Sequence, residues 1–272
     1  MSATSHLLRD KAPITDATWS LLDEEARERL SPALAARKLV DFTGPKGWEY
    51  SATNLGRTEP LANAPEQGIG ALKRRVLPLT ELRAGFAIKR TELEDADRGA
   101  EDVDLDPLAE AALRIARAEN AAVFHGWSEA GITGVAQACS HESISLDEDF
   151  DAYPRHVAEA VETLLKAGVA GPYGLALGPD GYTGVIQTTE HGGFPLFDHL
   201  KRILAGGPIV YSPGVQGAVV VSQRGGDFLF ESGQDFSIGY QGHDEDVVHF
   251  YIEESFSFRV ASPEAACALV PS

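Results

Sequence analysis

Two extended segments separated by a long interruption constrain the fold of this chain more than any other feature. Residues 48–55 and 76–88 both have a strand-like pattern, and a stretch with proline and glycine lies between them at 60–70. Strands that pair across such an interruption form a two-stranded ribbon that reaches away from the body of the protein. An isolated ribbon is only marginally stable in water. The ribbon therefore needs a partner surface, which favours a protein that assembles.

The first 47 residues predict a helical arm. Thr15 carries an N-cap oxygen, and apolar residues follow it at helical spacing. Ser31 and Pro32 are typical of a new helix start, with serine as the cap and proline in the first turn. Residues 44–47 read Gly-Pro-Lys-Gly, which ends this second helix in a sharp turn.

An acidic segment follows the second strand-like run. From Glu92 to Asp106 there are eight acidic residues and one arginine. Its last part begins like a calcium-binding loop, but Pro107 stands where that loop requires glycine and Leu113 where it requires glutamate. We therefore interpret the segment as a solvated turn before a helix N-terminus, where carboxylates are favoured.

The helix after this turn is the best defined in the chain. Asp106 is its expected cap, Pro107 its first residue and Gly126 its end. Beyond Gly126, helices are expected at 153–167 and on both sides of residues 190–193, and short strands are expected at 173–177 and near residues 209 and 219. Alternating helices and strands favour a compact α/β subdomain.

The C-terminal quarter predicts a long strand. From Val248 to Val260 apolar residues alternate with polar ones, and Glu254 is the one interruption. A period of two is the pattern of a strand with one buried and one exposed face. At this length the strand is expected to be the spine of a sheet.

Net charge narrows the classes of function. The chain has 272 residues, 41 acidic and 23 basic, for a net charge of −18. Proteins that bind nucleic acids usually carry a basic patch, and the only compact basic group here is residues 73–75. Apolar runs fall far short of the ~20 residues of a membrane-spanning helix, and residues 1–11 lack a signal-peptide core. We expect a cytoplasmic protein that binds neither nucleic acid nor membrane.

The sequence contains no recognisable motif for catalysis, a metal or a cofactor. There is no GxSxG nucleophile motif and no phosphate-binding GxxxxGK[ST] loop. His141-Glu142 begins like a zinc-protease motif, but no second histidine follows at the required spacing. Cys139 and Cys267 belong to no CxxC motif and are predicted to be buried free thiols. We therefore predict neither an enzyme nor a metalloprotein.

Five segments together resemble segments of encapsulin shell proteins, which are also known as linocin-type bacteriocins. They are LVDFTGPKGWE at 39–49, GPY at 171–173, RGGDF at 224–228, GQDFSIGY at 233–240 and the closing stretch at 256–265. Their order and spacing carry the resemblance, which covers nearly the whole chain and points to type 1 encapsulins.

The resemblance implies an α+β protein with the major-capsid fold of tailed phages, the Hong Kong 97-type fold. The parts it implies are 1–48 as the N-terminal helical arm and start of the peripheral domain, 49–92 as the extended loop, 93–131 as the spine helix of the peripheral domain, 132–222 as the axial domain, and 223–272 as the return strands of the peripheral domain. The predicted ribbon, long helix and α/β region fit this plan.

The resemblance also implies a function. Encapsulin subunits close into an icosahedral shell, expected here to hold about 60 subunits, around a cargo enzyme that carries a C-terminal targeting peptide. Typical cargoes of the family are dye-decolorizing peroxidases and ferritin-like proteins. The shell subunit itself is expected to have no catalytic residues and no cofactor.

Residues that match the family's groove for the targeting peptide are Leu34, Arg37, Asp41, Asp235 and Ile238. The two apolar side chains are expected to receive leucines or isoleucines of the peptide, and the aspartates a basic residue. As an alternative, Arg37 and Asp41 lie four residues apart and pair with each other on a helix.

Glu190, His191, Gly192 and Gly193 match the position of the family's pore loops. We expect this loop to line the five-fold opening of the shell, where the charge of His191 would change near pH 6–7, its ordinary titration range. The alternative is a histidine that is merely exposed to solvent.

Two other functions remain open at this point. A phage or prophage capsid protein shares the expected fold, although the sequence shows no long basic arm and no separate scaffold-like region at its start. A bacteriolytic or proteolytic bacteriocin, which the older family name suggests, would need a nucleophile motif.

Overall fold

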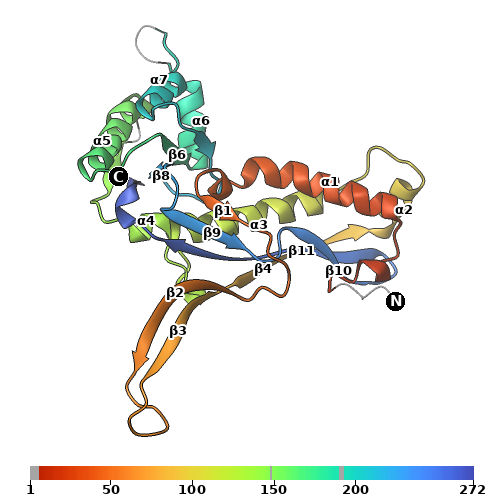
Figure 1. Cartoon of the computed structure of the whole chain (residues 1–272). Coiled ribbons are helices and arrows are strands. Elements are labelled where there is room, and N and C mark those ends of the chain that lie inside the picture. Colours follow the sequence, from red (N-terminus) through yellow and green to blue (C-terminus); the bar gives the residue numbers. More distant parts are fainter. Residues whose placement is uncertain (1–5, 148, 190–192) are drawn as a thin grey trace.

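The computed structural model describes residues 6–147, 149–189 and 193–272. A long sheet with helices along one face forms one part of the molecule, and a smaller sheet with its own helices forms the other (Figure 1). A two-stranded ribbon projects from near their junction.

The larger sheet has the strand order β1-β9-β11-β10, and β4 pairs with the opposite edge of β11. Its strands are β1 (Asp41–Thr43), β4 (Thr80–Lys89), β9 (Phe228–Ser232), β10 (Ser237–His243) and β11 (Val247–Val260). Its helices are α1 (Asp16–Ala33), α2 (Arg90–Asp97) and α3 (Asp106–His125). Helices α1 and α3 lie side by side over one face of the sheet (Figure 1).

Strand β11 is the centre of this sheet, as the alternating pattern predicted. It pairs with β10 and β4 along its first part and with β9 along its second. The prediction of one exposed face is wrong, because β11 is buried on both faces. Glu254 lies under α3, and Glu253 on the other face contacts His6 at 2.7 Å and Arg83 at 3.0 Å.

Helix α1 begins as predicted but ends later. The hydroxyl of Thr15 caps its N-terminus, accepting a backbone N–H bond at 3.3 Å. The predicted new helix at Ser31 and Pro32 is wrong, because α1 runs through both residues. Pro32 lies in the last turn, where its missing N–H removes a single helical hydrogen bond. Only a short 3-10 segment, Ala36–Lys38, follows.

The acidic segment is partly helical, which the sequence did not predict. Residues 92–97 belong to α2, so the turn spans only residues 98–105. Asp106 is the first residue of α3 and not its cap, while Gly126 ends the helix as expected, with φ of 88°. A Cβ at Gly126 would lie 2.8 Å from the backbone nitrogen of Gly134, so glycine is required at this close approach.

The predicted ribbon is present, formed by β2 (Ala52–Leu61) and β3 (Ala71–Pro78) in antiparallel pairing. It is shorter than the expected range 49–92, since residues 80–89 form β4 and pair with β11 inside the larger sheet. Apolar side chains exposed along the ribbon or at its tip are Leu61, Ile69, Leu72 and Val76. The ribbon has little of its own chain to pack on, which agrees with the need for a partner surface.

Glu231 of β9 fixes the root of the ribbon to the sheet. Its Oε2 atom accepts hydrogen bonds from Lys46 Nζ at 2.7 Å, Tyr50 Oη at 2.7 Å and Thr53 Oγ1 at 2.9 Å. Burial disfavours the charge of Glu231, but these three donors outweigh burial and hold its pKa below the ordinary value. One carboxylate thus ties three positions that precede or begin β2.

The smaller sheet has the order β5-β12-β8-β6-β7. Its strands are β5 (Ile144–Leu146), β6 (Tyr173–Leu177), β7 (Ile209–Tyr211), β8 (Ala218–Ser222) and β12 (Ala266–Pro271). The accompanying helices are α4 (Val135–Ala138), α5 (Tyr153–Lys166), α6 (Pro179–Gln187) and α7 (Leu196–Ile203). These elements lie where the sequence predicted them, with the exception of α4, β5 and β12.

Strand β12 brings the end of the chain back to the smaller sheet, between β5 and β8, and not to the larger sheet that the range 223–272 was expected to complete. Cys267 of β12 is buried, and burial raises its pKa to about 12. Cys139 is half-buried, with its Sγ 3.0 Å from the carbonyl oxygen of Ala266. Both cysteines are free thiols, as predicted.

Candidate functional site

A groove of about 560 Å³ runs between α1 and the start of β10. Its lining residues are Arg9, Asp23, Ala26, Arg27, Leu30, Ser31, Leu34, Arg37, Lys38, Asp235, Phe236, Ser237, Ile238 and Ile252. Four of the five predicted groove residues are among them, and only Asp41 is not. The structure thus brings together side chains that the resemblance named, although Arg37 and Asp235 lie 198 positions apart in the chain.

The apolar floor of the groove is mostly closed. Leu30 and Ile238 have relative exposures of 5% and 2%, so they support the floor but offer little surface. Leu34, at the end of α1, and Phe236, before β10, are half-buried and supply the accessible apolar surface. A ligand with apolar side chains would bury surface chiefly against these two residues.

Asp41 has a different place from the one predicted. It begins β1, and its carboxylate accepts a hydrogen bond of 2.7 Å from the backbone N–H of Gly226. The alternative pairing with Arg37 on a helix is also wrong, because the chain between them leaves the 3-10 segment and enters β1. Asp41 holds the loop after β8 to the sheet.

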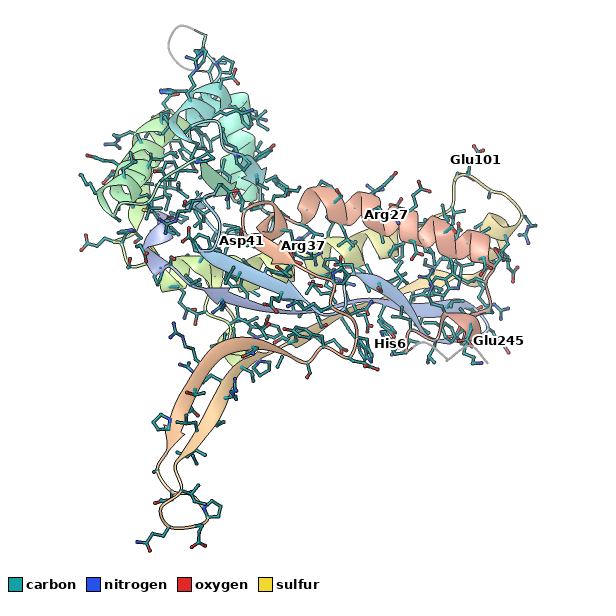
Figure 2. All side chains as sticks on the ribbon, viewed as in Figure 1. His6, Arg27, Arg37, Asp41, Glu101 and Glu245 are labelled. Atoms are coloured by element: carbon teal, nitrogen blue, oxygen red, sulfur yellow. The ribbon has the colours of Figure 1, made fainter. Side chains whose placement is uncertain are left out.

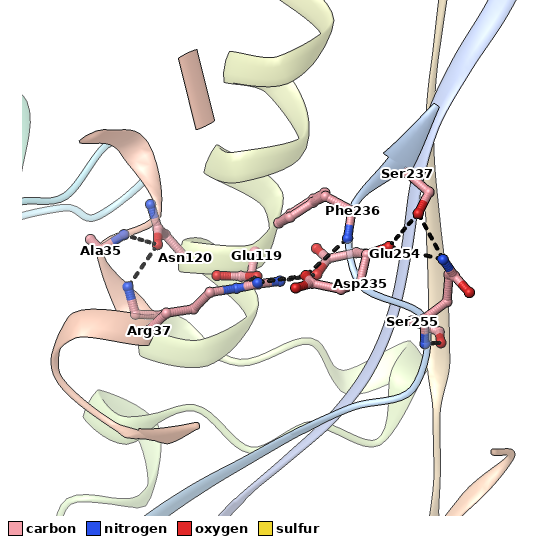
Figure 3. A network of polar contacts seen from close by, with 11 residues as sticks. Ala35, Arg37, Glu119, Asn120, Asp235, Phe236, Ser237, Glu254 and Ser255 are labelled. Atoms are coloured by element: carbon pink, nitrogen blue, oxygen red, sulfur yellow. Dashed lines mark hydrogen bonds and ion pairs between the residues drawn. The ribbon is translucent and has the colours of Figure 1, made fainter. Parts of the chain in front are cut away.

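Arg37 is the centre of a buried charge network (Figure 3). Its Nε donates to Glu119 at 2.7 Å, Nη1 to Asp235 at 2.7 Å and Nη2 to Glu254 at 2.9 Å. The guanidinium also lies 4.6 Å from the ring centroid of Phe236. Burial disfavours its charge, but the three carboxylates outweigh burial and raise the pKa of Arg37 further above its ordinary value.

Glu119 of α3 and Glu254 of β11 are both fully buried beside this one cation. Burial raises the pKa of both carboxyls, and the charge of Glu119 raises that of Glu254 further. The Oε1 atom of each lacks a hydrogen-bond partner with good geometry among the described residues. One guanidinium cannot neutralise three carboxylates, so the Glu119–Glu254 pair binds a proton more tightly in the folded chain than ordinary glutamates do.

Asn120 fixes the backbone that carries Leu34 and Arg37 (Figure 3). Its Oδ1 accepts the N–H groups of Ala35 and Ala36, both at 3.0 Å. Its Nδ2 donates to the carbonyls of Ala33 at 2.8 Å and Pro213 at 2.9 Å. All four hydrogen-bonding positions of this buried amide are satisfied, so it specifies the turn after α1.

Sequence reasoning missed the buried residues beneath the groove and several that line it. Glu119 and Asn120, beneath it, gave a signal, because two adjacent polar residues interrupt the small apolar face of α3. Asp23 is held by a two-bond contact with Arg9, at 2.7 and 3.1 Å. Figure 2 places Arg27 on α1 between Arg37 and the acidic turn that carries Glu101. Nothing in the spacing of these charges distinguished them from an ordinary exposed helix face.

The predicted pore loop is only partly visible. Glu190, His191 and Gly192 lie outside the described residues, and Gly193 follows them with φ of 81°. In the described ranges, no three His, Cys, Asp or Glu side chains gather in a way that would hold a metal ion. The helices among these residues also include none with both the length and the apolar character to cross a bilayer.

Comparison with known proteins decides the family. Residues 4–257 match the family described as encapsulating protein for peroxidase. The chain belongs to the encapsulin family. It is 47% identical over 268 residues to the type 1 encapsulin shell protein of Rhodospirillum rubrum, covering 97% of this chain and 95% of that protein. Encapsulins of this kind are shell proteins and not enzymes, in agreement with the missing catalytic motifs.

Solved structures show the encapsulin fold to be that of phage capsids. The virus-like particle of Pyrococcus furiosus superposes with a TM-score of 0.61 at 19% identity, covering 92% of this chain and 98% of that one. A protein of Mycobacterium phage Ogopogo superposes with a TM-score of 0.57 at 14% identity, covering 89% and 92%. The α+β tailed-phage major-capsid fold is therefore confirmed. The fold alone does not separate encapsulins from phage capsids, but the sequence match does.

Proposed function

We propose that this chain assembles in the cytoplasm into a closed icosahedral shell of about 60 subunits. The shell encloses a cargo enzyme, a dye-decolorizing peroxidase or a ferritin-like protein, whose C-terminal peptide lies in the groove between α1 and β10. The description of the matching family, encapsulating protein for peroxidase, supports the peroxidase as first candidate. The ribbon, which exposes apolar residues and has little of the described chain to pack on beyond its root, supports assembly.

The groove itself carries the peptide proposal. Leu34 and Phe236 offer apolar surface next to the half-exposed carboxylate of Asp235, whose side chain is 39% exposed. This combination fits a short peptide with leucine or isoleucine beside a basic residue. Arg37 is fully engaged by three carboxylates, so its role is to orient Asp235 and not to bind the peptide directly.

A co-expression pull-down tests this proposal. A fluorescent protein fused to the targeting peptide is purified with shells of wild type, Asp235→Asn, Leu34→Glu and Asp41→Asn. Loss of one charge-assisted hydrogen bond costs about 1.5–3 kcal/mol, so Asp235→Asn is expected to weaken peptide binding about tenfold or more. Because many grooves bind one oligomeric cargo, a monomeric fluorescent protein is used to avoid compensation by avidity.

Asp41→Asn is the matched control, since it makes the same chemical change outside the groove. Equal loading in all four shells would contradict the groove assignment. Loss of loading with Asp41→Asn alone would move the site to the loop around Gly226.

The pore assignment of residues 190–193 remains a separate proposal, tested by comparing substrate access to an enclosed enzyme in wild type and His191→Ala across the pH range of histidine titration.

A further inference from the structure

A second cavity lies at the root of the ribbon and has an unusual lining for so acidic a chain. It measures about 390 Å³, and three arginines line it: Arg57 of β2, Arg75 of β3 and Arg259 of β11. None of the three has a carboxylate or hydrogen-bond partner for its guanidinium among the described residues. The remaining walls are largely apolar, with Leu55, Leu77, Phe258 and Val260.

The positions of two of these arginines are unfavourable in an isolated subunit. Arg57 and Arg75 are direct cross-strand partners in the ribbon, so their side chains lie on the same face. Like charges at such a pair destabilise a two-stranded ribbon. Two pairs further along, Glu59 stands opposite Lys73 at 3.5 Å, so the ribbon does use charge pairing elsewhere. The described residues of the same subunit thus supply no anionic partner for the arginines of this cavity.

The same subunit has an exposed group of carboxylates far from this cavity. The turn between α2 and α3 carries Glu101, Asp102 and Asp104, all exposed and without a basic partner among the described residues. Figure 2 shows Glu101 at the tip of this turn, at the end of the larger sheet remote from the ribbon. The two groups therefore cannot meet within one subunit.

We propose that the arginine cavity of one subunit receives the acidic turn, residues 101–104, of a neighbouring copy of this chain. This inference rests on the proposed function, because it specifies one contact of the shell. Two different and complementary surfaces at distant places form a head-to-tail contact, which generates rings when the rotation closes. The turn presents three exposed carboxylates, Glu101, Asp102 and Asp104, within four residues, which matches in charge a cavity lined by three arginines.

A second acidic turn at the same end of the subunit fits less well. In the turn between β10 and β11, the carboxylate of Asp244 already accepts two backbone N–H bonds of 2.9 Å and lies 3.8 Å from His249. The neighbouring Glu245 is exposed at the same end of the molecule (Figure 2). This turn therefore provides the matched control for charge reversal.

Complementary charge reversal tests the contact. Particle formation is measured by light scattering and negative-stain microscopy for Arg57→Glu/Arg75→Glu, for Glu101→Lys/Asp102→Lys and for the four changes together. Each double variant is expected to reduce the particle fraction about tenfold, and the combination to restore most of it. Arg74→Glu, on the opposite face of β3, and Glu245→Lys/Asp246→Lys are expected to have much weaker effects. Circular dichroism checks that each variant is folded.

Assembly of Glu101→Lys/Asp102→Lys at the wild-type level, or rescue by the Glu245 variant instead, would overturn the proposal. Stabilisation of wild-type particles by phosphate over chloride at equal ionic strength, with no effect of reversing the acidic turn, would identify the cavity as a site for a free anion and equally overturn it. If Arg74→Glu disrupted assembly as strongly as Arg57→Glu/Arg75→Glu, and the combined variant were not rescued, the effect would come from the charge of the ribbon in general. That result would also overturn the proposal.

A zero-length cross-link separates this inference from the proposed function. In the Arg75→Lys variant, carbodiimide treatment is expected to join position 75 of one copy to position 101 or 102 of another, as identified by mass spectrometry. A cross-link in oligomers that never close into shells would support the contact and contradict the shell. Closed shells with no such cross-link, together with failed charge rescue, would support the shell and contradict the contact.

Discussion

The guanidinium of Arg37 donates a 2.9 Å hydrogen bond to Glu254, a carboxylate without exposed surface in the middle of the longest strand. Arg37 sits just after α1, and Glu119 on α3 shares the same guanidinium. One cation therefore joins helix, helix and sheet directly beneath the groove. Removing one partner of this network leaves an uncompensated buried charge, so each such change is expected to destabilise the part of the molecule that contains the larger sheet.

The buried carboxyl pair predicts a stability that depends on pH. Burial, the charge of Glu119 and the nearby Asp235 raise the pKa of Glu254 well above its ordinary 4.5, while Arg37 opposes them. The folded state therefore binds a proton more tightly than the unfolded state does, so the contribution of this pair to stability is greatest below about pH 4.5 and falls as the pH rises through the raised pKa. Glu254→Gln is expected to flatten this fall. Thermal unfolding of particles from about pH 5 to about pH 9 measures it.

The control for this experiment is Glu110→Gln, an exposed carboxyl on the same helix as Glu119. It is expected to leave the pH dependence of unfolding unchanged. Equal slopes for wild type and Glu254→Gln would show that the buried pair does not hold the proton.

Replacing Arg37 by an uncharged residue is expected to lower the free energy of unfolding. Arg37→Met leaves Glu119 and Glu254 buried without a counter-charge, and breaking such a network costs about 3–5 kcal/mol of unfolding free energy. Arg37→Lys keeps the charge but cannot reach three carboxylates, so an intermediate loss is expected. Urea unfolding followed by tryptophan fluorescence measures both. A loss below about 1 kcal/mol for Arg37→Met would contradict the network's structural role.

Asn120 predicts a defect in both stability and groove shape. Asn120→Ala leaves the buried N–H of Ala36 without an acceptor, at about 1–3 kcal/mol, while the N–H of Ala35 keeps its 2.9 Å contact with the carbonyl oxygen of Ala33. Because these two residues separate Leu34 from Arg37, peptide loading is expected to fall along with the melting temperature. A variant that melts like wild type would show that water replaces the amide.

The root of the ribbon predicts sensitivity to acid. The pKa of Glu231 lies below 4.5, since the donors from Lys46, Tyr50 and Thr53 outweigh burial. Its contribution is therefore present above about pH 4.5 and is lost as the pH falls through the lowered pKa. Glu231→Gln is expected to weaken the ribbon root by about 1 kcal/mol and to reduce assembly at neutral pH, measured by light scattering. If this variant assembled as well as wild type, contacts with neighbouring subunits, and not Glu231, would orient the ribbon.

The spacing of charged residues along the sequence did not identify their partners in the structure. Glu254 looked like an interruption in an alternating strand, although it is the partner of Arg37. The pair Arg37 and Asp41 had ideal helical spacing, although the helix ends before them. In both cases the deciding contact joins residues more than 180 residues apart, so local spacing carries no information about it.

The sequence by itself determined the long helix after Asp106, the ribbon, the central strand and the family, because periodicity, glycine and proline positions and ordered motifs are local properties of the chain. Only the tertiary structure decided that Asp41 stands apart from the groove, that β12 returns to the smaller sheet, and that one arginine serves three carboxylates. The places of Asp41 and Arg37 depend on which polar groups find partners across elements, and the place of β12 depends on which strands are free to pair with it. Both are decided only once the elements have packed.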